Sequence, residues 1–90
     1  MTAVRVTLLT APDCEWCEQA KAVLARVGCD YDLEVTECST ATEEGRDLMV
    51  RHRVAFPPGV LIDGEAFSYG RLSERKLRRE LAARVAPRAG

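Results

Sequence analysis

Apolar and polar residues alternate along the first third of the chain in a strand–helix–strand pattern. The segment Val4–Thr10 is rich in β-branched residues and is typical of a strand. After a break at 11–13, a stretch with helical spacing continues until Gly28 ends it. Its shared apolar face consists of Cys17, Ala20, Val23, Leu24 and Val27. Residues Tyr31–Thr36 then alternate, which predicts a half-buried strand. Its inward positions are Tyr31, Leu33 and Val35.

The remainder predicts a helix, a hairpin and a final helix. Ser39 or Thr40 can cap a helix over about 42–52, which Gly45 weakens in its first turns. Its expected buried positions are Leu48, Met49 and, just beyond it, Val54. The dipeptide Asp63-Gly64 between apolar segments is typical of a tight hairpin turn. Ser73 caps the last helix, whose inward positions are Leu77, Leu81 and Val85. The order is βαβαββα.

Length and composition favour one small folded domain over residues 1–90. The chain has 90 residues, of which 47% are hydrophobic and 30% charged, as in ordinary folded proteins. No apolar run approaches the roughly 18 residues that a membrane span needs, so no membrane partner is expected. Arg5 interrupts the first apolar stretch, and no basic region precedes it, which is unlike a secretory signal. We therefore expect a cytoplasmic protein, and a monomer.

The net charge of −1 conceals an asymmetry. Residues 1–70 carry six basic and twelve acidic side chains, and residues 71–90 carry seven basic and two acidic ones. Basic residues of this kind usually form a solvated helix face, which is the interpretation favoured here. The alternative is a docking surface for an acidic partner or nucleic acid; we expect no nucleic-acid partner.

The segment Cys14-Glu15-Trp16-Cys17 carries the main chemical signal. It lies where the first strand gives way to the first helix, so its leading thiol falls at a helix N-terminus, which stabilises an anion. The acidic residues Asp13, Glu15 and Glu18 oppose this effect, so only a moderate lowering of the Cys14 pKa is expected. Cys17 lies on the apolar face and should be buried. Periodicity thus predicts that Cys14 attacks and Cys17 resolves the mixed disulfide.

Other interpretations of the cysteines remain open. The pair could be structural, or half of a zinc site completed by Cys29, Cys38 or His52, although the spacing lacks the second close pair of zinc ribbons. Cys29 is expected to be a buried, inert thiol. Cys38 is expected in a loop, where a third redox thiol or a glutathionylation site is conceivable. His52 is expected to be an exposed residue at a helix end.

The second informative segment, Phe56–Gly64, reads FPPGVLIDG. A proline directly before a core strand often fixes a turn, and is occasionally cis. Combined with the C-x-x-C and the final helix, this order resembles the thioredoxin superfamily over about residues 4–86. Within it, the short length is similar to glutaredoxins and glutaredoxin-like redoxins. The resemblance implies a four-stranded mixed sheet flanked by three helices.

The resemblance also implies a substrate groove beside the dithiol, shaped by Trp16 and the Pro57-Pro58 turn. Counting back from Ile62 assigns the family's cis proline to Pro58, with Pro57 as the alternative. The residue before that proline offers its backbone to substrates in this family, and Pro57 has a carbonyl but no N–H. Arg71, near a helix N-terminus, could hold a carboxylate.

Several family features are absent. Glutaredoxins usually have Pro-Tyr between the cysteines, a lysine shortly before the first, and a glycine pair that binds glutathione; none is evident here. The segment 67–71 loosely resembles the aromatic-Ser-x-Gly-Arg segment of redoxins that thioredoxin reductase reduces.

These observations predict a dithiol–disulfide oxidoreductase with no bound cofactor or metal, whose redox-active group is a Cys14–Cys17 disulfide. Its expected partners are a disulfide substrate, either a protein or a small thiol compound, and a source of electrons. Glutathione, another small thiol and thioredoxin reductase all remain open as reductants. The alternative is a thioredoxin-fold adaptor, with the two thiols incidental or binding a soft metal ion.

Overall fold

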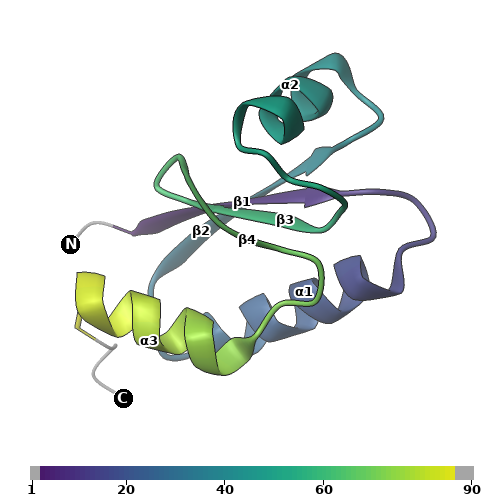
Figure 1. The fold of residues 1–90 in the computed structure, drawn as a ribbon. Helices are drawn as coiled ribbons and strands as arrows, with labels where there is room; N and C mark the ends of the chain where they lie inside the picture. Colours follow the sequence, from purple (N-terminus) through teal and green to yellow (C-terminus); the bar gives the residue numbers. More distant parts are fainter. Residues whose placement is uncertain (1–2, 87–90) are drawn as a thin grey trace.

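The computed structural model describes residues 3–86 as seven elements in the order βαβαββα, as the sequence predicts. The strands are β1 (Val4–Thr10), β2 (Leu33–Ser39), β3 (Gly59–Ile62) and β4 (Glu65–Tyr69). The helices are α1 (Glu15–Val27), α2 (Glu43–Arg51) and α3 (Glu74–Arg84). Figure 1 shows α1 and α3 on one side of the sheet and α2 on the other.

The four strands form one mixed sheet in the order β2-β1-β3-β4. β1 pairs with β2 in parallel and with β3 antiparallel, and β3 pairs antiparallel with β4. The parallel pair needs a crossover, which α1 supplies. The fold is therefore thioredoxin-like, and the end of β1 that leads into α1 carries the C-x-x-C.

The main core lies between the sheet and the α1–α3 layer. It comprises Val4, Val6, Leu8, Ala20, Val23, Leu24, Val27, Tyr31, Val60, Ile62, Leu72, Leu77 and Leu81. Alternate residues of β1 form the part of this core that lies on the sheet, because successive side chains of a strand point to opposite faces. Leu9 points the other way and is fully buried, and Val54 is buried as the sequence predicts. A Cβ on Gly59 would touch both side chains, so these residues form a second, smaller apolar layer.

The β3–β4 hairpin turns at Asp63-Gly64, as predicted. Both residues have positive φ, 49° and 83°, which this tight two-residue turn requires. The Asp63 backbone N–H donates to the Arg5 carbonyl at 2.7 Å, and its carboxylate accepts from the Arg5 N–H at 3.0 Å. The same carboxylate pairs with Arg84 of α3 at 3.3 Å. Asp63 thus ties the hairpin to β1 and to the last helix.

The position of β2 differs from the prediction. The backbone N–H groups of Asp30 and Tyr31 both donate to the Val27 carbonyl, so a turn that follows α1 includes Tyr31, which was expected to begin the strand. Tyr31 is buried, but from this turn and not from a strand. Val35, expected to face inward, is 43% exposed because β2 is an edge strand that α1 covers incompletely.

The start of α2 also differs from the prediction. Neither Ser39 nor Thr40 caps it: Ser39 ends β2, and the Thr40 N–H donates to the Thr10 carbonyl at 2.7 Å. Thr42 is the cap, because its hydroxyl accepts from the Gly45 N–H at 3.0 Å. Gly45 is buried, and a Cβ there would lie 2.0 Å from the Ser39 carbonyl oxygen. The glycine that propensity alone would disfavour is required by this close approach. Leu48 and Met49, which were expected to be buried, are only half-buried.

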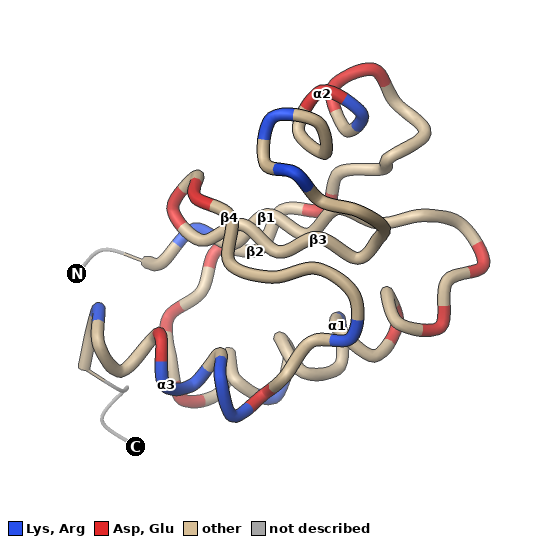
Figure 2. Tube along the Cα trace, in the orientation of Figure 1, with Lys and Arg blue, Asp and Glu red and all other residues tan. Residues whose placement is uncertain are grey.

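Basic residues of α3 are partly neutralised by acids of α3 itself and of neighbouring segments. Figure 2 shows the basic segments along α3. Arg78 pairs with Asp30 at 2.7 Å and with Glu74 at 3.0 Å. Arg26 of α1 pairs with Glu74 at 2.9 Å, and these hydrogen bonds, that from Arg26 foremost, hold the pKa of Glu74 below its ordinary value. Ser73 caps the helix as predicted, accepting from the Lys76 N–H. None of the helices within residues 3–86 is long and apolar enough to cross a bilayer.

Candidate active site around Cys14 and Cys17

Cys14 is the N-cap residue of α1. It has extended backbone angles, and its sulfur accepts a hydrogen bond from the Cys17 N–H at 3.1 Å. Its carbonyl accepts from the Glu18 N–H, which begins the helix. The preceding residue, Asp13, has a positive φ of 52°, which turns the chain sharply between β1 and α1. The Cys14 thiol is half-exposed and lies at the positive end of the helix dipole, as the sequence predicts.

Cys17 differs from Cys14 in burial and in protonation. It is 1% exposed, one turn into α1 on the face that packs against the sheet, which confirms its predicted burial. Desolvation by burial, followed by a hydrogen bond with the Cys14 side chain, raises the pKa of Cys17 to about 11. Cys17 therefore carries its proton at neutral pH. Both cysteines are free thiols in this structure.

The turn before β3 contains a cis peptide bond between Pro57 and Pro58. This confirms Pro58, and not Pro57, as the cis residue. Pro58 is buried, and its carbonyl accepts from the Gly70 N–H at 2.8 Å, while Pro57 is half-buried. The turn is therefore attached to the end of β4, and the Pro57 N–H that a substrate could use does not exist.

Three aromatic side chains form an exposed row that runs from the C-x-x-C to β4. Trp16 packs against Phe56 with ring centroids 5.9 Å apart, and Phe56 and Tyr69 form a T-shaped pair with centroids 5.2 Å apart. They are 47%, 45% and 48% exposed respectively. We call Trp16, Phe56 and Tyr69 the aromatic row. It places the Phe56–Pro58 turn beside the start of α1, and only its Trp16 was singled out from the sequence.

Gly70 permits this arrangement. Its φ is +79°, and a Cβ there would lie 2.9 Å from Phe56 Cε2 and 3.7 Å from Trp16 Cζ3. A larger residue would be strained and would displace Phe56. Arg71 directly follows this glycine. Arg71 is exposed, and within residues 3–86 its guanidinium forms no ion pair or hydrogen bond.

Gln19 holds the segment after Gly70 against α1. Its side-chain amide donates to the Leu72 carbonyl at 2.9 Å and accepts from the Leu72 N–H at 3.0 Å. The Leu72 side chain is buried in the core directly below. The sequence offered no sign of this role, because a glutamine in a helix is usually a solvated surface residue.

Known proteins resemble this chain in sequence and in fold. The family model of the glutaredoxin-like domain (DUF836) matches residues 5–82. The chain belongs to this glutaredoxin-like family. A malarial protein of known structure superimposes with a TM-score of 0.63 at 13% identity, covering 94% of this chain and all of that one. A thioredoxin from Thermus thermophilus gives a TM-score of 0.58 at 23% identity, covering 90% of this chain and 72% of the other. These likenesses show the thioredoxin-like fold. No curated protein matches the sequence.

The other two cysteines of this glutaredoxin-like chain lie in places that were not predicted. Cys29 is exposed, not buried, because it follows the last turn of α1 and its thiol reaches only the Ala25 carbonyl at 3.6 Å. Cys38 belongs to β2 and not to a loop, opposite Leu9 in the parallel register, and is half-buried. His52 does end α2, as predicted, but is half-buried. Within residues 3–86, no three His, Cys, Asp or Glu side chains gather as metal ligands would.

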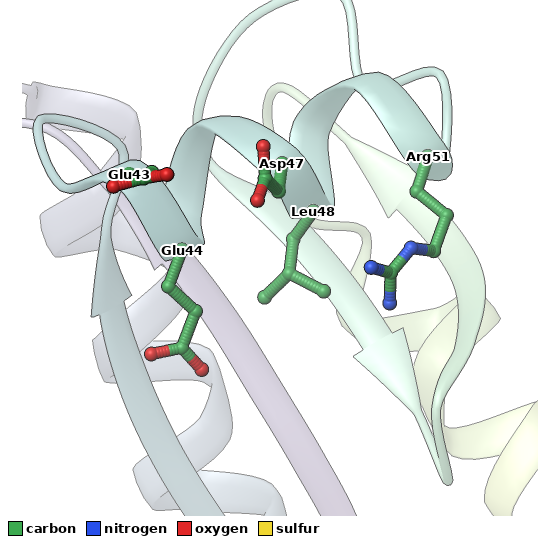
Figure 3. Close-up of a pocket in the computed structure, with 5 residues that line it drawn as sticks. All are labelled: Glu43, Glu44, Asp47, Leu48 and Arg51. Carbon is green, nitrogen blue, oxygen red and sulfur yellow. The ribbon is translucent and has the colours of Figure 1, made fainter.

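A hollow on α2 lies apart from the thiols. Figure 3 shows its lining residues, Glu43, Glu44, Asp47, Leu48 and Arg51. It contains no thiol and no histidine, and α2 covers the opposite side of the sheet from α1. A separate hollow is lined by Cys14, Glu15 and Trp16, which is the approach that a substrate would need.

Proposed function

We propose that this glutaredoxin-like protein is a thiol–disulfide oxidoreductase in which Cys14 is the nucleophile and Cys17 the resolving thiol. The observation that supports the proposal best is the asymmetry of the two sulfurs. One is half-exposed at a helix N-terminus, and the other is buried behind it with a pKa raised to about 11. Thiol–disulfide exchange needs one accessible sulfur that attacks and one protected sulfur that acts only afterwards.

In the first step the Cys14 thiolate attacks one sulfur of the substrate disulfide. The substrate S–S bond breaks, a mixed disulfide forms at Cys14, and one substrate thiolate leaves. In the second step Cys17 gives up its proton, attacks the Cys14 sulfur and expels the second substrate thiolate, which takes up a proton. Two electrons have then passed to the substrate, and a Cys14–Cys17 disulfide remains. A reductant must return two electrons before the next cycle.

The surroundings of Cys14 fit this chemistry. The Cys14 sulfur is half-exposed, and the Cys17 N–H donates to it at 3.1 Å, which holds it at the start of α1. The aromatic row offers an apolar surface beside it, on which part of a substrate can lie. The proposed substrate-contacting residues are Trp16, Pro57, Pro58 and Arg71. The proposed partners are a disulfide-bearing protein or small disulfide and a reducing system.

A redox titration followed by Trp16 fluorescence tests the proposal. Trp16 is the only tryptophan of the chain and stands between the two cysteines, so its emission should report the state of the dithiol. We expect a reversible two-electron couple, with a midpoint of about −200 to −270 mV, the range of thioredoxin and glutaredoxins. Cys14→Ser should abolish the couple, whereas Cys29→Ser, which removes an exposed thiol elsewhere, should leave it unchanged.

The roles of the two thiols can be separated. Cys17→Ser should accumulate a covalent adduct with the substrate, because no resolving thiol remains, and mass spectrometry should place it on Cys14. An adduct on Cys17 in the Cys14→Ser protein, at a comparable rate, would reverse the assignment. Absence of any reversible couple, with one soft metal ion bound per reduced chain, would instead favour an adaptor or metal-binding protein.

A further inference from the structure

Two carboxylates flank the attacking sulfur in the sequence and are left unneutralised. Asp13 precedes Cys14 and Glu15 follows it, and both are exposed. Neither forms an ion pair or a side-chain hydrogen bond within residues 3–86. Glu18 differs, because it pairs with Lys21 at 2.9 Å. Figure 2 shows the acidic segments that lead from β1 into α1.

Two unpaired cations lie along the aromatic row. Arg53 lines a hollow together with Tyr69, and Arg71 follows Gly70, which lies against Phe56 and Trp16. The surface therefore carries acidic side chains next to the sulfur and basic side chains beside the aromatic rings. When a disulfide-bearing segment binds, the residues on either side of its attacked cysteine would lie next to Asp13 and Glu15.

We infer that Asp13 and Glu15 determine specificity, selecting polypeptide disulfides whose cysteine is flanked by basic residues and disfavouring those with anionic neighbours. This inference rests on the proposed function. The attacked sulfur must come within bonding distance of Cys14, which brings its neighbouring residues within several ångströms of both carboxylates. At that range opposite charges attract and like charges repel, even in water. The aromatic row supports an extended segment but does not distinguish its charge.

The test uses chromogenic peptides that differ only in charge. Each blocked peptide has the sequence Ala-X-Cys-X-Ala, where X is Lys, Gln or Glu, and its cysteine is joined to pyridine-2-thiol. Attack by Cys14 on the peptide sulfur expels pyridine-2-thione, the same leaving group in every case. Cys17 then displaces the peptide thiol. Each rate is divided by the rate of the same peptide with dithiothreitol, which removes differences in intrinsic reactivity.

The expected normalised rates fall in the order Lys, Gln, Glu. The ratio between the Lys and Glu peptides should be about five- to tenfold at an ionic strength of ~0.1 M, for peptide charges about 8 Å or more from the carboxylates. It should approach one at about 1 M salt, because the screening length then falls to ~3 Å.

Variants assign the effect to the two carboxylates. Asp13→Asn combined with Glu15→Gln should reduce the ratio to about one or reverse it through Arg71, and asparagine tolerates the positive φ at position 13. The matched control is Glu34→Gln, an exposed acid opposite Arg5 at the far end of β1, which should keep the wild-type ratio. The ratio is informative because neutralising either acid also changes the reactivity of Cys14 toward all three peptides equally.

The outcomes separate this inference from the proposed function. Equal normalised rates for the three peptides, with Cys14-dependent release of the thione, would overturn the charge selection and leave the oxidoreductase intact. The same ratio in the Asp13→Asn/Glu15→Gln protein as in the wild type would also overturn it. Failure of all three peptides to react through Cys14 would overturn the oxidoreductase proposal itself.

Discussion

Replacing Gly45 with alanine should destabilise the protein, although it improves the intrinsic helix propensity of α2. In an exposed helix this change usually stabilises by about 0.8–1.0 kcal/mol. Here the added Cβ would lie 2.0 Å from the Ser39 oxygen, 2.7 Å from its carbonyl carbon and 3.0 Å from Thr40 Cα. These are backbone atoms, so no side-chain rotation relieves the contact. The start of α2 must move away from the end of β2 by about 1.5 Å to restore an ordinary contact distance.

The expected cost combines two effects. Overpacking of this kind costs about 1–3 kcal/mol. The movement also strains the hydrogen bond from the Gly45 N–H to the Thr42 hydroxyl, and an N-cap contributes about 1 kcal/mol. After subtracting the gain in propensity, we expect a net loss of about 2 kcal/mol from the free energy of unfolding.

Urea unfolding followed by far-ultraviolet circular dichroism measures this change. With a slope of about 1–2 kcal/mol per M for a domain of this size, the midpoint should fall by about 1–2 M. Val50→Ala, at an 80% exposed position of the same helix, is the control and should change stability by less than about 0.5 kcal/mol. A Gly45→Ala protein as stable as the wild type, or more so, would refute the close packing of α2 on β2.

Three further predictions follow from the site and the ion pairs. Iodoacetamide should modify Cys14 at pH 7 but reach Cys17 only in denaturant or as the pH nears 11, because burial raises the Cys17 pKa to about 11. Peptide mapping that found Cys17 labelled before Cys14 would contradict this. Glu74→Gln should lower the free energy of unfolding at neutral pH, and the difference from wild type should disappear on acidification. The lowered carboxyl pKa of Glu74 stabilises the fold at pH values above that pKa, and the stabilisation is lost as the pH falls through it. A difference that persists in acid would argue against the ion pairs. Gln19→Ala should cost about 1–3 kcal/mol through two lost hydrogen bonds to Leu72, and faster amide exchange at Leu72, with little change in exchange along β1, should accompany it.

The elements that sequence reasoning identified correctly are those with a strong local signal. Val4–Thr10 is a strand because β-branched residues dominate it, and Asp63-Gly64 turns because its backbone angles suit few other residues. The burial of Cys17 followed from helical spacing alone. Pro58 was identified as the cis residue through resemblance to a family and through counting, not through physical chemistry.

The errors occurred where tertiary contacts decide the outcome. Val35 alternates like an inward residue, but nothing in its neighbours reveals that β2 is an edge strand. Cys29 follows a helix terminator, and whether such a position is covered depends on elements far away in the sequence. Ser39 and Thr42 are equally good caps by residue type, and the pairing of β2 with β1 decided between them. The aromatic row likewise joins three segments that only the fold brings together.

The hairpin tip and the dithiol lie at opposite ends of the sheet, and this separation has a practical use. Asp63 fastens β1, the hairpin and α3 at one end, while Glu65, just after the turn, is exposed. The proposed chemistry and the anchoring contacts thus lie in different parts of one small molecule. A fluorophore or affinity handle attached at position 65 would report on the protein, or immobilise it on a surface, while leaving the sulfurs accessible.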